Sequence, residues 1–256
     1  MRNETKFEKN YDVIHRKQLS NVSWAEIKEI ADKGLAEKTF RVGDEKIIEL
    51  TTGEQVTLVI LGFNHDVKKN GNLAAITFGT KNMIDGRFEY ASWNKKDNHN
   101  NWQDSKIRKF YLKRFENLLP NDLSVNIATI NKVTIVGKNS TDIVKTTEKL
   151  FLPSLAEILS EQAIKESNIY YIKDSATTYL KEGKQYEYWK IKISKLVPNN
   201  YNKALVKYTN EGCASDWWLR SPCIDYSELS LYISTVGTID AEYSRESYSV
   251  SFCFCI

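Results

Sequence analysis

The chain has few residues whose types and spacing could do chemistry, and the clearest are Asn64-His65-Asp66 at the end of an apolar run. A histidine beside an aspartate could ligate a metal or serve as acid and base. No second histidine or carboxylate cluster follows at metal-ligand spacing. We therefore favour a plain turn, with hydrogen bonds from Asn64 and Asp66 and with His65 capping neighbouring backbone. The sequence predicts no metal site and no cofactor.

The four cysteines, all late in the chain, are the other candidates for reactivity. They are Cys213, Cys223, Cys253 and Cys255. One residue separates Cys253 from Cys255, whereas zinc ligands are usually about two to four residues apart, and no histidine is near. In a strand both thiols would share a face. We expect reduced cysteines in the core, and a disulfide and a metal site are the alternatives.

Two late turns, residues 223–228 and 243–248, carry the residue types that binding surfaces use. Tyrosine gives amphipathic contact area at low entropic cost, and serine and arginine give hydrogen bonds. Ordinary polar turns have a similar composition, so that alternative stays open. The candidate ligand-binding residues are Tyr226, Glu228, Tyr243, Arg245 and Tyr248.

A strand over residues 216–220 would position these turns. In a strand, Trp217 and Trp218 point to opposite faces, so each indole would serve a different surface of one sheet. Arg220 would share a face with Trp218, where its guanidinium can stack on the indole or fork onto a carboxylate or carbonyls. Pro222 would end the strand. We expect these four residues to form structural core.

The remaining periodicity predicts an α+β fold, with antiparallel sheets and a few supporting helices. Helices are expected over 23–31, from 105 to Pro120, and from Ser154, where Ser-x-x-Glu forms a capping box. The core stripe of the second helix would be Ile107, Phe110, Tyr111, Arg114, Phe115 and Leu118. Strands are expected within 39–63 and over 73–78, 131–136, 216–220, 229–234, 238–242 and 248–255. The segment 165–211 gives no clear pattern.

Composition limits the classes of partner. The 36 basic and 33 acidic residues are interspersed and give a net charge of +3, so neither nucleic acid nor membrane is expected as a partner. The longest apolar run, Val56–Phe63, is far shorter than the roughly 20 residues of a membrane span. Residues 1–38 are expected to be a polar lead-in with a short helix, followed by an α+β domain over 39–256. Without a signal peptide, synthesis is expected in the cytoplasm.

An ordered set of motifs resembles an uncharacterised domain family of bacteria and their phages, marked by a Trp-Trp-Leu-Arg-Ser-Pro core, over roughly residues 24–256. The motifs are Trp217-Trp218-Leu219-Arg220-Ser221-Pro222, Val59-Ile60-Leu61-Gly62-Phe63-Asn64-His65-Asp66, Trp102-x-x-Ser105-x-x-Arg108, Leu119-Pro120-x-Asp122-Leu123 and Phe151-Leu152-Pro153-Ser154-x-x-Glu157. The resemblance implies a C-type-lectin-like C-terminal half, about residues 212–256. The last strand, Ser249–Phe254, departs from the family's Gly-Val-Arg-Pro-Ala-Leu-like ending. The chain also lacks the Glu-Pro-Asn and Gln-Pro-Asp tripeptides of calcium-dependent sugar binding.

The leading hypothesis is therefore a non-catalytic recognition module that presents its C-terminal turns to a protein or glycan ligand. One alternative is a structural or receptor-binding component of a phage or prophage particle, in a phage or cell-surface assembly. The other is a cysteine-dependent enzyme of lectin-like fold. With no glycine-rich phosphate loop and no Gly-x-Ser-x-Gly elbow in the sequence, catalysis has little support.

Overall fold

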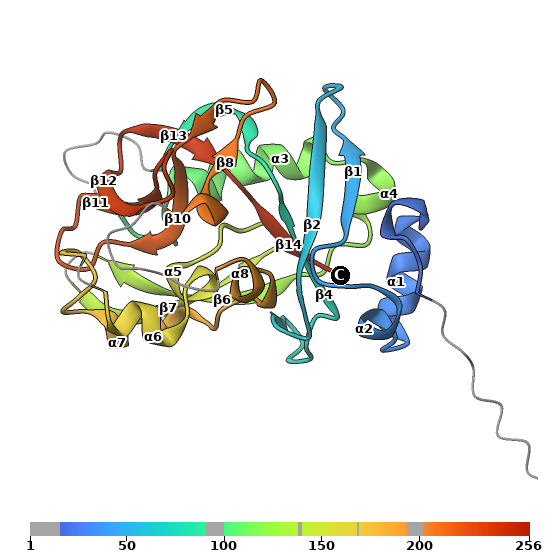
Figure 1. The fold of residues 1–256 in the computed structure, drawn as a ribbon, viewed down its shortest axis with the longest axis horizontal. Coiled ribbons are helices and arrows are strands. Elements are labelled where there is room, and N and C mark those ends of the chain that lie inside the picture. Colours follow the sequence, from blue (N-terminus) through green and yellow to red (C-terminus); the bar gives the residue numbers. More distant parts are fainter. Residues whose placement is uncertain (1–15, 91–99, 138–139, 168, 194–201) are drawn as a thin grey trace, which may run out of the picture.

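A computed structural model describes residues 16–90, 100–137, 140–167, 169–193 and 202–256. Helices and sheets built mostly from antiparallel pairs make up this part of the chain, which confirms the predicted α+β class (Figure 1). The sequence also predicts a long loop over residues 92–104, which are rich in asparagine, aspartate, lysine and tryptophan, and most of that loop lies outside the described residues.

The first sheet has four strands in the order β1-β2-β4-β14, all antiparallel to their neighbours. The strands are β1 (Glu45–Glu49), β2 (Gln55–Phe63), β4 (Ile76–Thr80) and β14 (Cys253–Cys255). The interior position of β2 agrees with its run of apolar residues, which predicted a strand buried on both faces. The last strand of the chain completes this sheet beside β4.

The second sheet has five strands in the order β12-β11-β10-β13-β5. They are β5 (Ile84–Glu89), β10 (Trp217–Pro222), β11 (Leu229–Ile233), β12 (Ile239–Tyr243) and β13 (Ser247–Val250). Within this sheet the strands β10 and β13 are parallel, whereas all other neighbouring strands are antiparallel.

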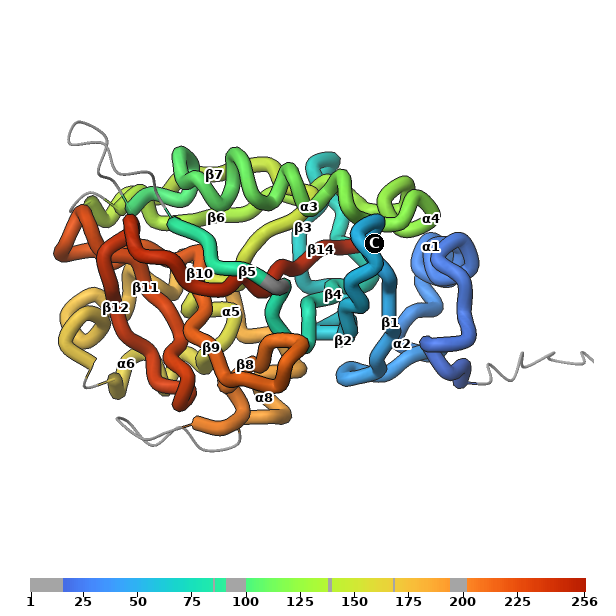
Figure 2. Tube along the Cα trace, turned by 90° about the horizontal axis from the view of Figure 1, so that it is seen from above, coloured from blue at the N-terminus to red at the C-terminus, as the bar shows by residue number. Residues whose placement is uncertain are grey.

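The prediction of a single strand over 248–255 is wrong, because the chain passes from the second sheet to the first within these residues. β13 ends at Val250, and β14 begins at Cys253 in the first sheet. A hydrogen bond stabilises the segment between the two strands, since the Ser251 hydroxyl lies 2.9 Å from the Thr80 hydroxyl at the end of β4. Figure 2 shows this last segment running from the β10–β13 region towards β4.

Two smaller sheets complete the strands. The first has the order β3-β6-β7, and the second pairs β8 with β9. They comprise β3 (Val67–Lys68), β6 (Ile130–Gly137), β7 (Ser140–Glu148), β8 (Lys207–Tyr208) and β9 (Ala214–Ser215). β6 confirms the strand expected at 131–136.

The N-terminal helix α1 (Trp24–Asp32) forms as its capping sequence predicts. The Ser23 side chain accepts a hydrogen bond from the Glu26 backbone N–H, and Gly34 follows in the left-handed region with φ of 68°. A 3₁₀ turn, η1 (Leu19–Asn21), precedes α1, and a short helix, α2 (Ala36–Thr39), follows it. No strand forms at residues 40–42, although one was expected there.

The long central helix begins as a π-helical turn, η2 (Ile107–Tyr111), and continues as α3 (Leu112–Leu118). The predicted core stripe is wrong at Phe110, which is 57% exposed, and at Arg114, which is also exposed, whereas Leu112 is buried. A π-turn adds a residue per turn and rotates the buried face, so a stripe drawn at the 3.6-residue period fails across it. A short helix, α4 (Asn121–Ser124), follows Pro120.

The helix expected from Ser154 is α5 (Leu155–Ile158), and α6 (Glu161–Lys165) follows it. Short helices also occupy the region 165–211, which showed no sequence pattern. They include α7 (Ala176–Tyr179), η3 (Leu180–Glu182), α8 (Glu187–Lys192) and η4 (Lys203–Leu205). The Glu157 carboxylate accepts from the Ser154 N–H at 2.9 Å, as the Ser-x-x-Glu signature predicted. Within the described residues, no helix is both long enough and apolar enough to cross a membrane.

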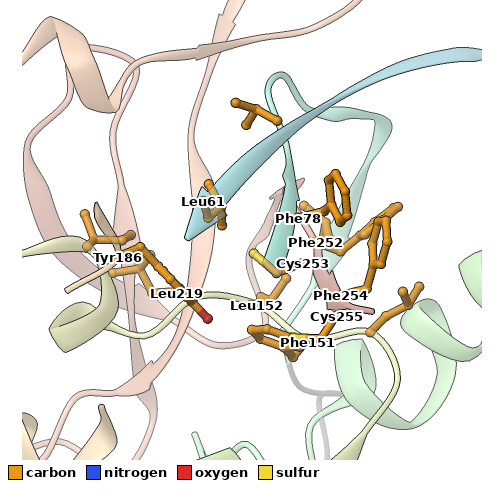
Figure 3. Packing of buried hydrophobic residues seen from close by; sticks show 14 of the residues in the cluster. Leu61, Phe78, Phe151, Leu152, Tyr186, Leu219, Phe252, Cys253, Phe254 and Cys255 are labelled. Carbon is orange, nitrogen blue, oxygen red and sulfur yellow. The ribbon is translucent and has the colours of Figure 1, made fainter. Parts of the chain in front are cut away.

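The core joins the N-terminal helix to the first sheet through aromatic rings. Phe78 of β4 and Phe254 of β14 stack with centroids 5.2 Å apart, as Figure 3 shows. Trp24 of α1 meets both rings edge-on, at 5.4 and 6.2 Å. Such aromatic contacts add to the gain from burial itself, so α1 packs as part of the body of the protein.

Candidate functional site

The strand beneath the candidate turns, β10, is buried along its whole length. Trp217 and Trp218 are both fully buried and have different neighbours. The Trp217 ring stacks on Trp189 at 6.5 Å, and its Nε1–H donates to the Leu205 carbonyl at 3.1 Å. The Trp218 ring contacts Tyr248 at 4.6 Å. The two indoles therefore join β10 to different parts of the structure.

Arg220 is fully buried, and its guanidinium forks onto a carboxylate and carbonyls as expected. Nη2 donates to Glu157 Oε1 at 3.2 Å and to the Glu182 carbonyl at 3.5 Å, and Nη1 donates to the Leu152 carbonyl at 3.4 Å. Pro222 is the last residue of β10, which confirms that the strand ends there.

Arg220 belongs to a buried ionic network that the sequence did not reveal. Its charged members come from five separate segments: Asp66, Lys132, Glu157, Glu182 and Arg220. The Lys132 ammonium pairs with Asp66 Oδ1 at 2.6 Å and also with Glu157. Burial alone would lower the pKa of Lys132, but Asp66 and Glu157 together raise it above its usual value. Lys132 is therefore charged at neutral pH.

The prediction that Asp66 forms a turn hydrogen bond is wrong. Its carboxylate is buried and accepts from the Thr77 hydroxyl at 2.6 Å and from the Tyr186 hydroxyl at 2.9 Å. Burial would raise the pKa of Asp66, but the Lys132 and His65 side chains hold it well below its usual value. The physical reason for the error is that all but one of these partners are distant in sequence.

The prediction that His65 caps neighbouring backbone is wrong, because the carbonyl that it contacts is 119 residues away in sequence. Its Nε2 lies 2.9 Å from the Lys184 carbonyl, and its ring lies against Tyr186 with centroids 4.1 Å apart. Nδ1 is 3.7 Å from the Asp66 carboxylate. The predicted turn hydrogen bond of the Asn64 side chain is also wrong, because this side chain donates to Glu37 of helix α2 at 2.9 Å and so joins the end of β2 to that helix.

Glu182 is the member of the network whose charge is least compensated. Its carboxylate accepts from the Ile135 backbone N–H at 3.1 Å and from the Ser221 hydroxyl. Burial raises its pKa to about 7, and Arg220 and Ser221 offset this only in part. The charged groups of Asp66, Lys132, Glu157 and Arg220 are buried and hydrogen-bonded to one another, so the network joins segments that are distant in sequence.

The cysteines give little basis for thiol chemistry. All four are free thiols, and three are buried, which confirms the expected reduced core cysteines except at Cys213, which is exposed. Burial raises the pKa of Cys223 to about 11, that of Cys253 to about 12, and that of Cys255 well above its usual value. Within the residues that the structure describes, no cluster of three or more histidine, cysteine or acidic side chains could hold a metal.

The two predicted turns meet at one end of the β11–β12 hairpin. Leu229 at the start of β11 pairs with Tyr243 at the end of β12, and the Ser244 N–H donates to the Glu228 carbonyl at 2.8 Å. The hydroxyls of Ser230 and Ser244 lie 2.7 Å apart beneath them. The structure therefore brings residues 223–228 and 243–248 into contact.

Tyr226 extends this surface to two tyrosines that the sequence analysis missed. Its ring contacts Tyr170 and Tyr171, with centroids at 6.3 and 5.8 Å, and its hydroxyl lies 2.9 Å from that of Tyr170. Tyr170 is 60% exposed. The adjacent tyrosines were the available signal, but their segment has no periodicity that would place them near the late turns.

The other candidates divide into surface and scaffold. Tyr243 is 40% exposed, and the Arg245 guanidinium lies over its ring at 4.3 Å. Glu228 is half-buried and accepts from the Ser227 hydroxyl at 3.2 Å. Tyr248 lies on strand β13 and packs on Trp218, so much of its ring serves the scaffold.

Comparison with known proteins finds no match among curated proteins and none among solved structures. A family model matches residues 74–256, more than half of the chain, and its description is a domain of unknown function, DUF6273. The matched region contains β10 and both turns but begins after Val59–Asp66, so it is shorter than the resemblance over roughly 24–256 that the motifs suggested. With most of its length matched, the chain belongs to the DUF6273 family.

Proposed function

We propose that this protein is a non-catalytic recognition module whose ligand surface lies on residues 223–228 and 243–248, together with Tyr170 and Tyr171. The observation that carries the proposal is a set of tyrosines, the exposed Tyr170 and Tyr243 and the half-buried Tyr226, at the end of a sheet whose central strand is fully buried. Aromatic faces on a rigid support give contact area at low entropic cost.

The proposed ligand is a protein segment or a glycan, since tyrosine rings can stack on sugars and on apolar side chains alike. We further propose that residues 212–256 form a C-type-lectin-like half, on the basis of the Trp-Trp-Leu-Arg-Ser-Pro strand and the short strands after it. A bacterial or phage origin, in which the module serves a particle or cell-surface assembly, is part of the same proposal. The buried thiols give no support to the cysteine-dependent enzyme.

The test is binding of the purified protein to a panel of glycans and bacterial surfaces. The informative variant is Tyr170→Ala with Tyr226→Ala and Tyr243→Ala, which leaves the Tyr248–Trp218 contact intact. Tyr208→Ala, at an exposed tyrosine on β8, is the matched control. We expect the native protein and the control to bind and the triple variant to lose at least about tenfold in affinity. Equal binding by all three proteins would refute the proposed surface.

A further inference from the structure

A pocket of about 490 Å³ opens beside the ionic network, between the end of β2, strand β6 and the loop after η3. This volume is in the range of about 300–1,000 Å³ that small-molecule sites occupy. Neither candidate turn contributes a residue to its lining. The pocket is therefore separate from the proposed recognition surface.

The charges around the pocket favour an anion. Two lysines of its lining, Lys181 and Lys184, are exposed and flank Glu182 and Gly183, and neither has a carboxylate partner among the described residues. The acidic lining residues are instead buried and hydrogen-bonded inside the network. Those acidic residues are Asp66, Glu157 and Glu182. An incoming ligand thus meets two uncompensated ammonium groups before any free carboxylate.

The buried charges nearly cancel one another. Lys132 and Arg220 balance Asp66 and Glu157, and Glu182, with its pKa at about 7, is only partly ionised at neutral pH. The field at the opening is therefore set mainly by the two exposed lysines, because the interior contributes little net charge.

The lining also has an apolar part. Val67 and Leu73 both line the pocket, are 40% and 50% exposed, and pair with each other through a single β-bridge. Exposed aliphatic side chains beside free ammonium groups suit a ligand with a charged head and a hydrocarbon part, since each part of the ligand then meets its own kind of surface.

We propose that this pocket binds a small organic anion, with its anionic head held between Lys181 and Lys184 and a short hydrocarbon part packed on Val67 and Leu73. His65 and Lys132 lie in the same lining and close it on the side of the network. The head group is a carboxylate or a phosphate, because both accept from ammonium donors. The hydrocarbon part is short, since the pocket has room only for a small molecule.

The test is a titration with hexanoate, followed by nuclear magnetic resonance at the backbone amides of Gly183 and Leu73. Acetate and 1-hexanol are the matched probes, because acetate lacks the chain and hexanol lacks the charge. We expect hexanoate to shift both amides at millimolar concentration and to bind more tightly than either matched probe. Hexyl phosphate, run in parallel, distinguishes a phosphate head from a carboxylate.

Variants separate the pocket from general anion effects. Lys181→Gln with Lys184→Gln should weaken hexanoate binding about fivefold, since each exposed charge pair contributes modestly. Lys145→Gln with Lys149→Gln, at two exposed lysines of the β7 region, should leave it unchanged. Added salt should weaken binding by the native protein. The proposal is overturned if hexanoate shifts neither amide, if hexanol binds as well, or if the pocket double variant keeps native affinity.

Discussion

Glu182→Gln tests whether the buried network makes stability depend on pH. Glutamine has nearly the shape of the protonated glutamic acid, and its carbonyl can still accept from the Ile135 N–H. It cannot ionise. The substitution therefore removes the proton equilibrium while largely preserving packing.

The sign and size follow from the pKa. Folding raises the pKa of Glu182 from 4.5 to about 7 because the carboxyl is buried. The folded state therefore holds a proton that the unfolded state releases between these values, so its contribution is fully present below pH 4.5 and is lost as pH rises through about 7. At about 1.4 kcal/mol for each pKa unit, the free energy of unfolding falls by about 3 kcal/mol across this pH range.

The assay is urea unfolding of the native and variant proteins at about pH 5.5 and about pH 8.5. At the lower pH the unfolded carboxyl is already mostly ionised, so the native protein has lost about 1.4 kcal/mol, and the variant's altered hydrogen bond to Ser221 costs about 1 kcal/mol. The two proteins should therefore have similar free energies of unfolding. At the higher pH the variant should be more stable by about 2 kcal/mol, after about 1 kcal/mol is allowed for its altered hydrogen bond to Ser221. Glu187→Gln, at an exposed glutamate of α8, should show no such difference.

The reasoning is refuted if the difference between native and variant free energies of unfolding is the same at both pH values. A variant that is less stable by a constant amount would show that Glu182 acts only through its hydrogen bonds. A difference of the opposite sign at high pH would show that the carboxylate is compensated by Arg220 more fully than its burial implies.

Two further predictions concern packing and charge. Lys132→Met should destabilise the fold by about 3–5 kcal/mol in urea unfolding, because it leaves Asp66 without its cation in the interior; a loss below about 1 kcal/mol would contradict this. Leu112→Ala should cost about 2–5 kcal/mol, whereas Phe110→Ala should change stability by less than about 0.5 kcal/mol. If Phe110→Ala cost more stability than Leu112→Ala, the buried face of the helix would instead follow the 3.6-residue period.

Features set by neighbouring residues were predictable from the sequence. The cap of α1 and the signature of α5 each depend on residues three apart, and the apolar run of β2 identifies a central strand. The burial of β10 followed from two adjacent tryptophans. The stripe on the long helix failed because its η2 segment is a π-helical turn rather than part of a regular α-helix.

The ionic network was not predictable, because its pairs are distant in sequence. Lys132 and Asp66 are 66 residues apart, and Arg220 and Glu157 are 63 apart. Lysine, arginine, aspartate and glutamate usually lie on the protein surface, so none of these residues, taken alone, indicates a buried position. Tyr170 and Tyr171 were missed for a related reason. They lie in a turn between α6 and α7, and helices of four or five residues are too short to show a period that would place the turn.

The match to residues 74–256 does not by itself mark out a unit that could fold alone. Strand β2 lies outside it, yet β2 pairs with β4 inside the first sheet. Asp66 also lies outside it, and without that carboxylate the buried Lys132 ammonium would keep only Glu157, which Arg220 shares. Removing β2 would leave an edge of β4 unpaired, which costs stability. Removing Asp66 would leave the buried Lys132 cation with only part of its counter-charge, which is also destabilising. The folded unit therefore includes at least β2 and the residues up to Asp66.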